Sequence, residues 1–294
     1  MDKFIAEIRP DPPFSYKSTL FAHGWADLEP FRIGQDLRTL NYSLLIAPQK
    51  IVQVKIIDES DTTIRIFSDE DLGQTDIERV VDLIRHIFRL DENFAEFYHI
   101  AETEPAFKWI VEKKAGRLLR AGSLWEDMVK ILCTTNCSWH LTKLMVSNMV
   151  QKIAQGTHFP EPAEIAVLDE NFLRKEVKMG YRAPFLLEMA QNVKNNLIDL
   201  KQWAHWVGNS EELFKEMRKI KGLGEYAVSS ILKLLGHYDY LGIDSWGRRT
   251  FAERYNQGKR TDDRSIRSKY KKYGKWSGLF FWMDLTQDLY INKK

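Results

Sequence analysis

One acidic side chain is well placed to do chemistry. Asp244 closes the loop "HYDYLGID" (237–244) and directly precedes a predicted helix that starts at Ser245. A fixed carboxylate can stabilise a positive charge that develops on a substrate, and it can orient or deprotonate an attacking water molecule. The alternative role is that of a helix N-cap, in which the carboxylate accepts hydrogen bonds from the first backbone N–H groups. The two roles are compatible, so Asp244 is the candidate catalytic residue.

The segment before this loop predicts a helical hairpin. Helical patterns cover 211–219 and 225–235, and "KGLG" (221–224) separates them. Gly222 and Gly224 can adopt positive φ, and without a Cβ they let the backbone approach another molecule closely. The second helix presents unpaired N–H groups and the positive end of its dipole, which favour an anion such as phosphate. We therefore predict that Lys221, Gly222 and Gly224 bind phosphate, with a plain turn as the alternative.

Hairpin, loop and aspartate together resemble the helix-hairpin-helix DNA glycosylases, in which a Gly/Pro-rich loop ends in a catalytic aspartate. Gly242 stands in this loop, whereas Ile243 precedes the aspartate and the family's usual proline is absent. Three further segments match the family in order, so the resemblance covers most of the chain. They are "CTTNCSW" (133–139), "MGYRAPFLLEMA" (179–190) and "YGKWSGLFFWMDL" (273–285).

The resemblance implies roles for residues outside the hairpin. Rotating a nucleotide out of a duplex costs a few kcal/mol, and something must fill the gap. By resemblance, Asn136 enters that gap, Tyr181 wedges into the duplex and Arg182 contacts the orphaned partner base. Asp244 then stabilises the sugar cation that forms when the N-glycosidic bond breaks. Without the resemblance, Tyr181 and Arg182 would be the surface-exposed start of a helix after Gly180.

The residue at position 226 bears on the reaction type. Relatives that also cut the strand carry a lysine two positions after the second hairpin glycine, and this lysine forms a Schiff base with the sugar. Here that position is Tyr226. The resemblance therefore implies a monofunctional glycosylase, which leaves an abasic site and has no lyase step.

Aromatic residues indicate the lesion class. The candidate base-pocket residues are Tyr226, Trp246, Phe281 and Trp282. Aromatic faces attract a cationic base, so an alkylated purine of the 3-methyladenine type is the leading substrate. Phe281 also stands where oxidised-guanine enzymes carry a glutamine. An oxidised purine is the alternative, because Asn136 and the Tyr181–Arg182 pair look more like that branch. An aromatic stripe at helical spacing can equally belong to the core.

Charge separates the remaining function classes. Residues 1–110 carry 12 Lys+Arg against 20 Asp+Glu, and residues 111–294 carry 31 against 21. The basic part, with aromatics interleaved over 246–276, suits a polyanion such as DNA. A catalytically inactive, structure-specific DNA-binding protein is a second possibility. A helical scaffold with a fortuitous turn is a third, and it would show no salt-dependent DNA affinity.

Cofactor requirements follow from the same residues. The chain has two cysteines, Cys133 and Cys137, too few for the four-cysteine iron–sulfur cluster of some relatives. By resemblance, one Na⁺ or K⁺ can bind the hairpin through the backbone carbonyls of Arg218, Ile220 and Leu223. No cofactor is expected to be required.

The predicted fold is α+β and predominantly α-helical. Strand-like runs at 43–47, 51–57 and 62–67 predict an N-terminal antiparallel sheet, and helical periodicity begins at Asp76. The predicted domains are a β domain (1–75), a helical subdomain with the Asn136 and Tyr181–Arg182 segments (76–205) and the hairpin, Asp-loop and C-terminal helix region (206–294). No apolar segment is long enough for a membrane or a secretion signal. We expect an intracellular monomer that acts on double-stranded DNA with a damaged base, in the cytoplasm or nucleoid of a bacterium or the nucleus of a eukaryote.

Overall fold

The computed structural model describes residues 2–60 and 62–291, which form two compact units. The first unit contains Met1–Asp91 and Arg117–Gln202, and the second contains Glu92–Gly116 and Trp203–Lys294. The predicted α+β class is confirmed, since a five-stranded antiparallel sheet is followed by helices. The division differs from the predicted boundaries at 75 and 205. The sheet shares a unit with the helices that follow Arg117, and the segment from Glu92 to Gly116 joins the C-terminal helices.

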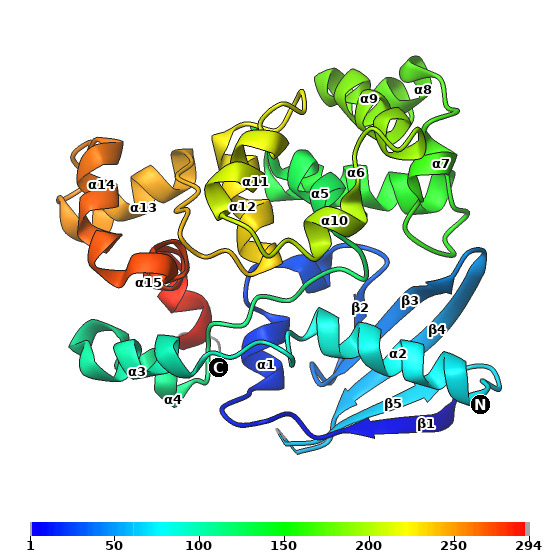
Figure 1. Cartoon of the computed structure of the whole chain (residues 1–294), viewed down its shortest axis with the longest axis horizontal. Helices are drawn as coiled ribbons and strands as arrows, with labels where there is room; N and C mark the ends of the chain where they lie inside the picture. The colour runs from blue at the N-terminus through cyan, green and yellow to red at the C-terminus, as the bar shows by residue number, and fades with distance from the viewer. Residues whose placement is uncertain (1, 61, 292–294) are drawn as a thin grey trace. The chain divides into compact units, whose positions relative to one another are not determined.

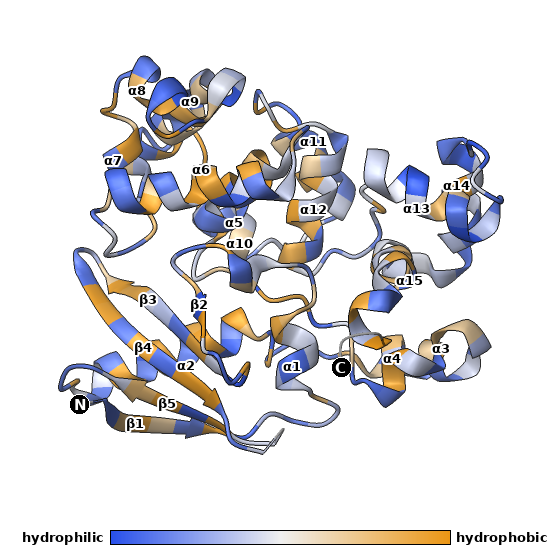
Figure 2. Ribbon diagram, turned by 180° about the vertical axis from the view of Figure 1, so that it is seen from behind, coloured by the Kyte–Doolittle hydropathy of each residue, from blue (hydrophilic) through white to orange (hydrophobic). Residues whose placement is uncertain are grey.

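The sheet has the strand order β1-β5-β4-β3-β2 (Figure 1). The strands are β1 (Lys3–Ile8), β2 (Arg32–Ile33), β3 (Thr39–Ala47), β4 (Lys50–Asp58) and β5 (Ile64–Ser68). The three predicted strands are confirmed as β3, β4 and β5, whereas β1 and the two-residue β2 were not predicted. Burial alternates along β3, so one face is apolar, and α2 (Gln74–Ile87) packs against β1 and β3. Figure 2 shows hydrophobic and hydrophilic residues mixed along these strands.

Helix α5 anchors the rest of the first unit. The helices of this unit are α1 (Tyr16–Leu20), α2, α5 (Leu124–Thr134), α6 (Trp139–Lys152), α7 (Pro162–Ile165), α8 (Glu170–Lys175) and α9 (Ala183–Lys194), and α10 (Leu200–Ala204) spans the boundary between the units. Glu126 of α5 accepts from the Tyr42 hydroxyl at 2.6 Å and pairs with Lys130 at 2.6 Å. Asp127 accepts from Trp25 Nε1 at 2.6 Å, and burial raises the pKa of Asp127 to about 6. Partnered in this way, the charged side chains of a buried helix fix its position.

The second unit has helices and loops but no strand in its described residues. Its helices are α3 (Ala95–Thr103), α4 (Lys108–Glu112), α11 (Ser210–Met217), α12 (Glu225–Leu235), α13 (Ser245–Tyr255), α14 (Asp263–Tyr270) and α15 (Ser277–Ile291). The predicted helix 225–235 coincides with α12, and the predicted 211–219 corresponds to α11. Phe97 of α3 packs against Phe280 of α15 at 4.8 Å between ring centroids. This contact explains why the segment from Glu92 to Gly116 belongs to the unit.

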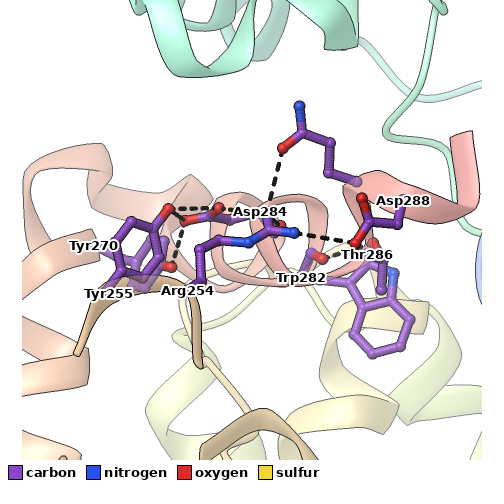
Figure 3. Close-up of polar contacts among 8 residues, drawn as sticks. Arg254, Tyr255, Tyr270, Trp282, Asp284, Thr286 and Asp288 are labelled. Carbon is purple, nitrogen blue, oxygen red and sulfur yellow. Dashed lines mark hydrogen bonds and ion pairs between the residues drawn. The ribbon is translucent and has the colours of Figure 1, made fainter. Parts of the chain in front are cut away.

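Asp284 ties α13 and α14 to α15 (Figure 3). Its carboxylate accepts from the hydroxyls of Tyr255 at 2.6 Å and Tyr270 at 2.6 Å, and from Arg254 Nη1 at 3.1 Å. Burial and the Asp284 charge together raise the pKa of Tyr270 well above its ordinary value. The network therefore fixes α13, whose first residue directly follows Asp244.

None of the described helices is both long and apolar enough to cross a membrane. Within residues 2–60 and 62–291, no three His, Cys, Asp or Glu side chains are grouped so that they could hold a metal ion.

Candidate functional site

The hairpin glycines play two different parts. Gly222 has φ +87°, a conformation that favours glycine, as predicted. Gly224 has φ −71° and ψ 176°, so it does not use the positive φ that glycine allows, and it is the N-cap residue of α12. A Cβ at Gly224 would meet nothing within 4 Å. The approach to the first N–H groups of α12 is therefore open, and this favours an anion.

The carbonyls predicted to bind a monovalent cation are already engaged in part. Leu223 O accepts from Arg218 Nη1 at 2.7 Å, and Ile220 O accepts from Leu223 N at 3.2 Å. A Na⁺ or K⁺ at these oxygens would have to compete with the Arg218 guanidinium, which carries the same charge. Each carbonyl keeps a second lone pair, so cation binding at the hairpin stays a prediction. Lys221, the candidate phosphate ligand that carries a positive charge, is exposed.

Asp244 has one oxygen bound and one available. It is the N-cap residue of α13, as predicted, and its Oδ1 accepts from Gly247 N at 2.6 Å. Within the described part of the chain, Oδ2 accepts no hydrogen bond, and the side chain is partly exposed. The carboxylate is thus fixed through one oxygen while the other can face a substrate, which is the arrangement expected of an electrostatic catalyst.

The loop from His237 to Asp244, called here the Asp loop, is supported by three helices. The Tyr240 ring stacks on Phe214 of α11 at 4.6 Å. The Tyr240 carbonyl lies against α15, where a Cβ at Gly278 would come within 1.9 Å of it, so that position requires glycine. On α12, Lys233 Nζ donates to Leu241 O at 2.9 Å. Sequence reasoning missed Lys233 and Gly278, although a lysine inside the apolar stripe of 225–235 was a visible signal.

The aromatic candidates separate into surface and core. Trp246 is 37% exposed and lies 6.0 Å from Trp282 between ring centroids. Tyr226, in the first turn of α12, is partly exposed. Phe281 is 2% exposed and packs edge-on against Tyr270 at 5.3 Å. Trp246 and Trp282 thus form a pair near the surface, whereas Phe281 is buried in the core. A core position was the alternative interpretation of these aromatic residues.

Several residues of the basic stretch line one cavity. A cavity of about 620 Å³ is lined by Arg264 and Arg267 of α14, by Lys271 directly after this helix, and by Asp239 and Leu241 of the Asp loop. Arg267 also forms an ion pair with Glu225, the first residue of α12. Figure 2 shows α14 as mostly hydrophilic. The cavity therefore places positive charge beside the Asp loop.

In the first unit, the structure brings Asn136 and Tyr181 together. Asn136 has φ +47°, a left-handed conformation that asparagine tolerates better than most residues. Its Nδ2 donates to the Tyr181 hydroxyl at 3.4 Å, and this hydroxyl is 3.4 Å from Thr135 O. Tyr181 is 48% exposed. Two side chains predicted to enter a duplex thus lie side by side on the surface of this unit.

Arg182 lies beneath Tyr181 and is 3% exposed. Its guanidinium stacks on the Tyr181 ring at 4.5 Å, donates from Nε to Thr135 Oγ1 at 3.2 Å and also binds Thr135 O. Its contact with a partner base stays a prediction. In this arrangement Arg182 supports the Tyr181 ring and links it to Thr135.

Comparisons with known proteins agree on the fold. No protein-family model matches the chain. A curated protein of Bacillus subtilis (strain 168), named "Putative DNA-3-methyladenine glycosylase YfjP", is 20% identical over 227 residues, 72% of this chain and 77% of that protein. A 3-methyladenine DNA glycosylase from Archaeoglobus fulgidus is 17% identical, with a TM-score of 0.78 over 98% of this chain and 100% of that one.

A second branch of glycosylases is structurally similar to about the same degree. The 8-oxoguanine glycosylase/lyase of Clostridium acetobutylicum, in complex with double-stranded DNA containing cytosine opposite 8-oxoguanine, is 16% identical, with a TM-score of 0.75. The match covers 100% of this chain and 99% of that one. The predicted resemblance is thereby confirmed, and the chain has the fold of the helix-hairpin-helix DNA glycosylases, with 3-methyladenine and 8-oxoguanine DNA glycosylases as its structural neighbours.

Proposed function

We propose that the protein is a monofunctional DNA glycosylase that removes an alkylated purine from double-stranded DNA. One observation carries the proposal: Asp244 is fixed by capping α13 through Oδ1, while Oδ2 accepts no hydrogen bond from the described residues. The Asp loop follows a hairpin whose helix N-terminus is open to an anion. The names of the structural neighbours support DNA as the substrate class.

The chemistry assigned to Asp244 is hydrolysis of the N-glycosidic bond. The bond between the sugar C1′ and the base nitrogen breaks, and its electron pair leaves with the base. The positive charge left on the sugar is stabilised by the Asp244 carboxylate. A water oxygen then bonds to C1′, and Asp244 orients this water or accepts its proton. The products are the free base and an abasic site.

The sequence of the hairpin supports hydrolysis without a lyase step. A Schiff base requires an amine that reaches the sugar, and the position two residues after Gly224 is Tyr226. The C. acetobutylicum neighbour is named a glycosylase/lyase, so the fold accommodates both reaction types. Monofunctional hydrolysis is therefore proposed from Tyr226 and not from the fold.

Gly224→Ala is expected to weaken DNA binding without harming the fold. Its φ of −71° suits alanine, and the new Cβ would occupy the open space before α12. An anion at a helix N-terminus contributes roughly 1 to 2 kcal/mol in favourable geometry, so affinity should fall about fivefold to thirtyfold. Fluorescence anisotropy with a lesion-free duplex at fixed salt concentration measures this affinity.

Gly73→Ala is the matched control, because Gly73 caps α2 with φ −71° and also has nothing within 4 Å of a Cβ. It should leave DNA affinity unchanged. Equal affinities for Gly224→Ala and Gly73→Ala would argue against phosphate binding at the hairpin.

Gly222→Ala, with φ +87°, should instead lower the free energy of unfolding by about 1 to 2 kcal/mol.

The lesion class rests on the aromatic pair. Trp246 and Trp282 can stack on a cationic base, which favours an alkylated purine. An oxidised purine is the second candidate, because the Asn136 and Tyr181 side chains lie side by side.

Base release should be measured on duplexes that carry alkylated purines, hypoxanthine, uracil or 8-oxoguanine. The highest single-turnover rate is expected for an alkylated purine. A highest rate for 8-oxoguanine would favour the second candidate, and release from none would leave a DNA-binding protein without catalysis.

A further inference from the structure

A buried amine holds the Asp loop. Lys233 of α12 is 5% exposed, and its Nζ donates to Leu241 O at 2.9 Å and to Tyr240 O at 3.4 Å. Both carbonyls belong to the Asp loop, three and four residues before Asp244. An amine can make these two bonds whether it is charged or neutral, because the neutral form keeps two N–H groups. The tether therefore survives deprotonation.

The loop folds directly over this amine. Gly242 has φ +66°, and a Cβ placed on it would lie 3.2 Å from Lys233 Nζ. The amine is thus enclosed by the loop that it holds. A Schiff-base nucleophile must reach a sugar carbon, and an enclosed amine bonded to two carbonyls does not. Lys233 is therefore not the nucleophile of a Schiff base, and any contribution it makes to the reaction comes from its contacts with the Asp loop and from its charge.

Charge connects Lys233 to Asp244. The negative charge of Asp244 acts on the amine, and the neighbouring Ser229 and Ser230 of α12 are neutral. Burial lowers the pKa of Lys233 to about 7, and the negative charge of Asp244 acts in the opposite direction. Both protonation states of Lys233 are therefore populated near neutral pH.

We propose that Lys233 is a positioning residue for Asp244: it holds the Asp loop in either protonation state, and it slows base release when it is charged. The inference rests on the proposed function. An ammonium group near the carboxylate weakens the negative potential at the sugar, and thus the stabilisation of a developing cation. Neutral Lys233 keeps the loop in place without this opposing charge, so the rate should rise as the amine loses its proton.

The test is the pH dependence of 3-methyladenine release from methylated DNA. This base is already a cation, so the leaving group does not titrate over the range used. Between pH 6 and 9, the wild-type kcat should rise about threefold to tenfold with a midpoint near 7. Lys233→Met should lower kcat about tenfold to a hundredfold, because the catalytic group is displaced. It should change KM by less than about twofold and abolish the rise with pH.

Lys215→Met is the matched control, since Lys215 is an exposed lysine of α11 paired with Glu211. It should keep the wild-type kcat and pH profile. Lys233→Met with the wild-type kcat and pH profile overturns the inference while leaving the proposed function standing. A wild-type protein that releases no base overturns both. If Lys233→Met does not fold, the wild-type profile decides: a rise near pH 7 supports the inference, and a flat profile contradicts it.

Discussion

Asp244→Asn is expected to slow base release by about 10²- to 10³-fold, the loss that follows removal of one preorganised electrostatic group. Asparagine is as good an N-cap residue as aspartate, so the bond from Gly247 N and the start of α13 should persist. What disappears is the negative charge that stabilises the sugar cation. Single-turnover base release measures the rate, and anisotropy with a lesion duplex should show unchanged DNA affinity.

Asp262→Asn isolates the charge from the capping role. Asp262 caps α14 through its Oδ1, which accepts from Ser265 N at 3.0 Å, much as Asp244 caps α13. The substitution should leave base release unchanged. Wild-type rates from both variants would remove Asp244 from the reaction and assign the chemistry to another residue. Equal losses from both would mean that asparagine damages the caps themselves.

The second large effect is expected at Tyr181. Stacking of an aromatic side chain on bases contributes about 1 to 3 kcal/mol, so Tyr181→Ala should slow base release from a paired duplex by about fivefold to 150-fold. Because Tyr181 is 48% exposed, stability should change by less than about 0.5 kcal/mol. The loss should shrink on single-stranded DNA, where no partner base has to be displaced.

Leu197→Ala serves as the control for loss of exposed apolar surface, since Leu197 is 74% exposed in the same unit. It should leave base release unchanged on both substrates. An equal loss for Tyr181→Ala on paired and single-stranded DNA would contradict a wedge that acts during base extrusion. It would favour a general role of Tyr181 in binding.

The sequence predicts local structure well where one short pattern determines it. The apolar stripe of 225–235 lies between two glycines, and α12 has those limits, with Gly236 at φ +96° as its C-cap. The N-cap role of Asp244 is predicted in the same way, from an aspartate that directly precedes a helical pattern. Strands β1 and β2, at the two edges of the sheet, were not predicted, because β2 has only two residues and β1 lacks the alternating burial of β3.

Long-range packing explains what the sequence does not reveal. The segment from Glu92 to Gly116 belongs to the second unit because of contacts such as that between Phe97 and Phe280, two residues that are far apart in the chain. Lys233 becomes a buried partner of the Asp loop only because the chain turns back over α12. Arg182 follows Tyr181 directly, yet one is buried and the other exposed. Such assignments depend on the tertiary fold, which no local pattern encodes.

Borohydride trapping distinguishes hydrolysis at Asp244 from a reaction that passes through a covalent protein–DNA intermediate. The protein is incubated with a duplex carrying one alkylated purine, in the presence of borohydride, and base release and strand integrity are followed on the same samples. Hydrolysis by Asp244 should give free base and an intact strand with an abasic site, which breaks only after alkali treatment. No covalent protein–DNA adduct should form. A covalent adduct that accumulates as fast as base is released would contradict this prediction.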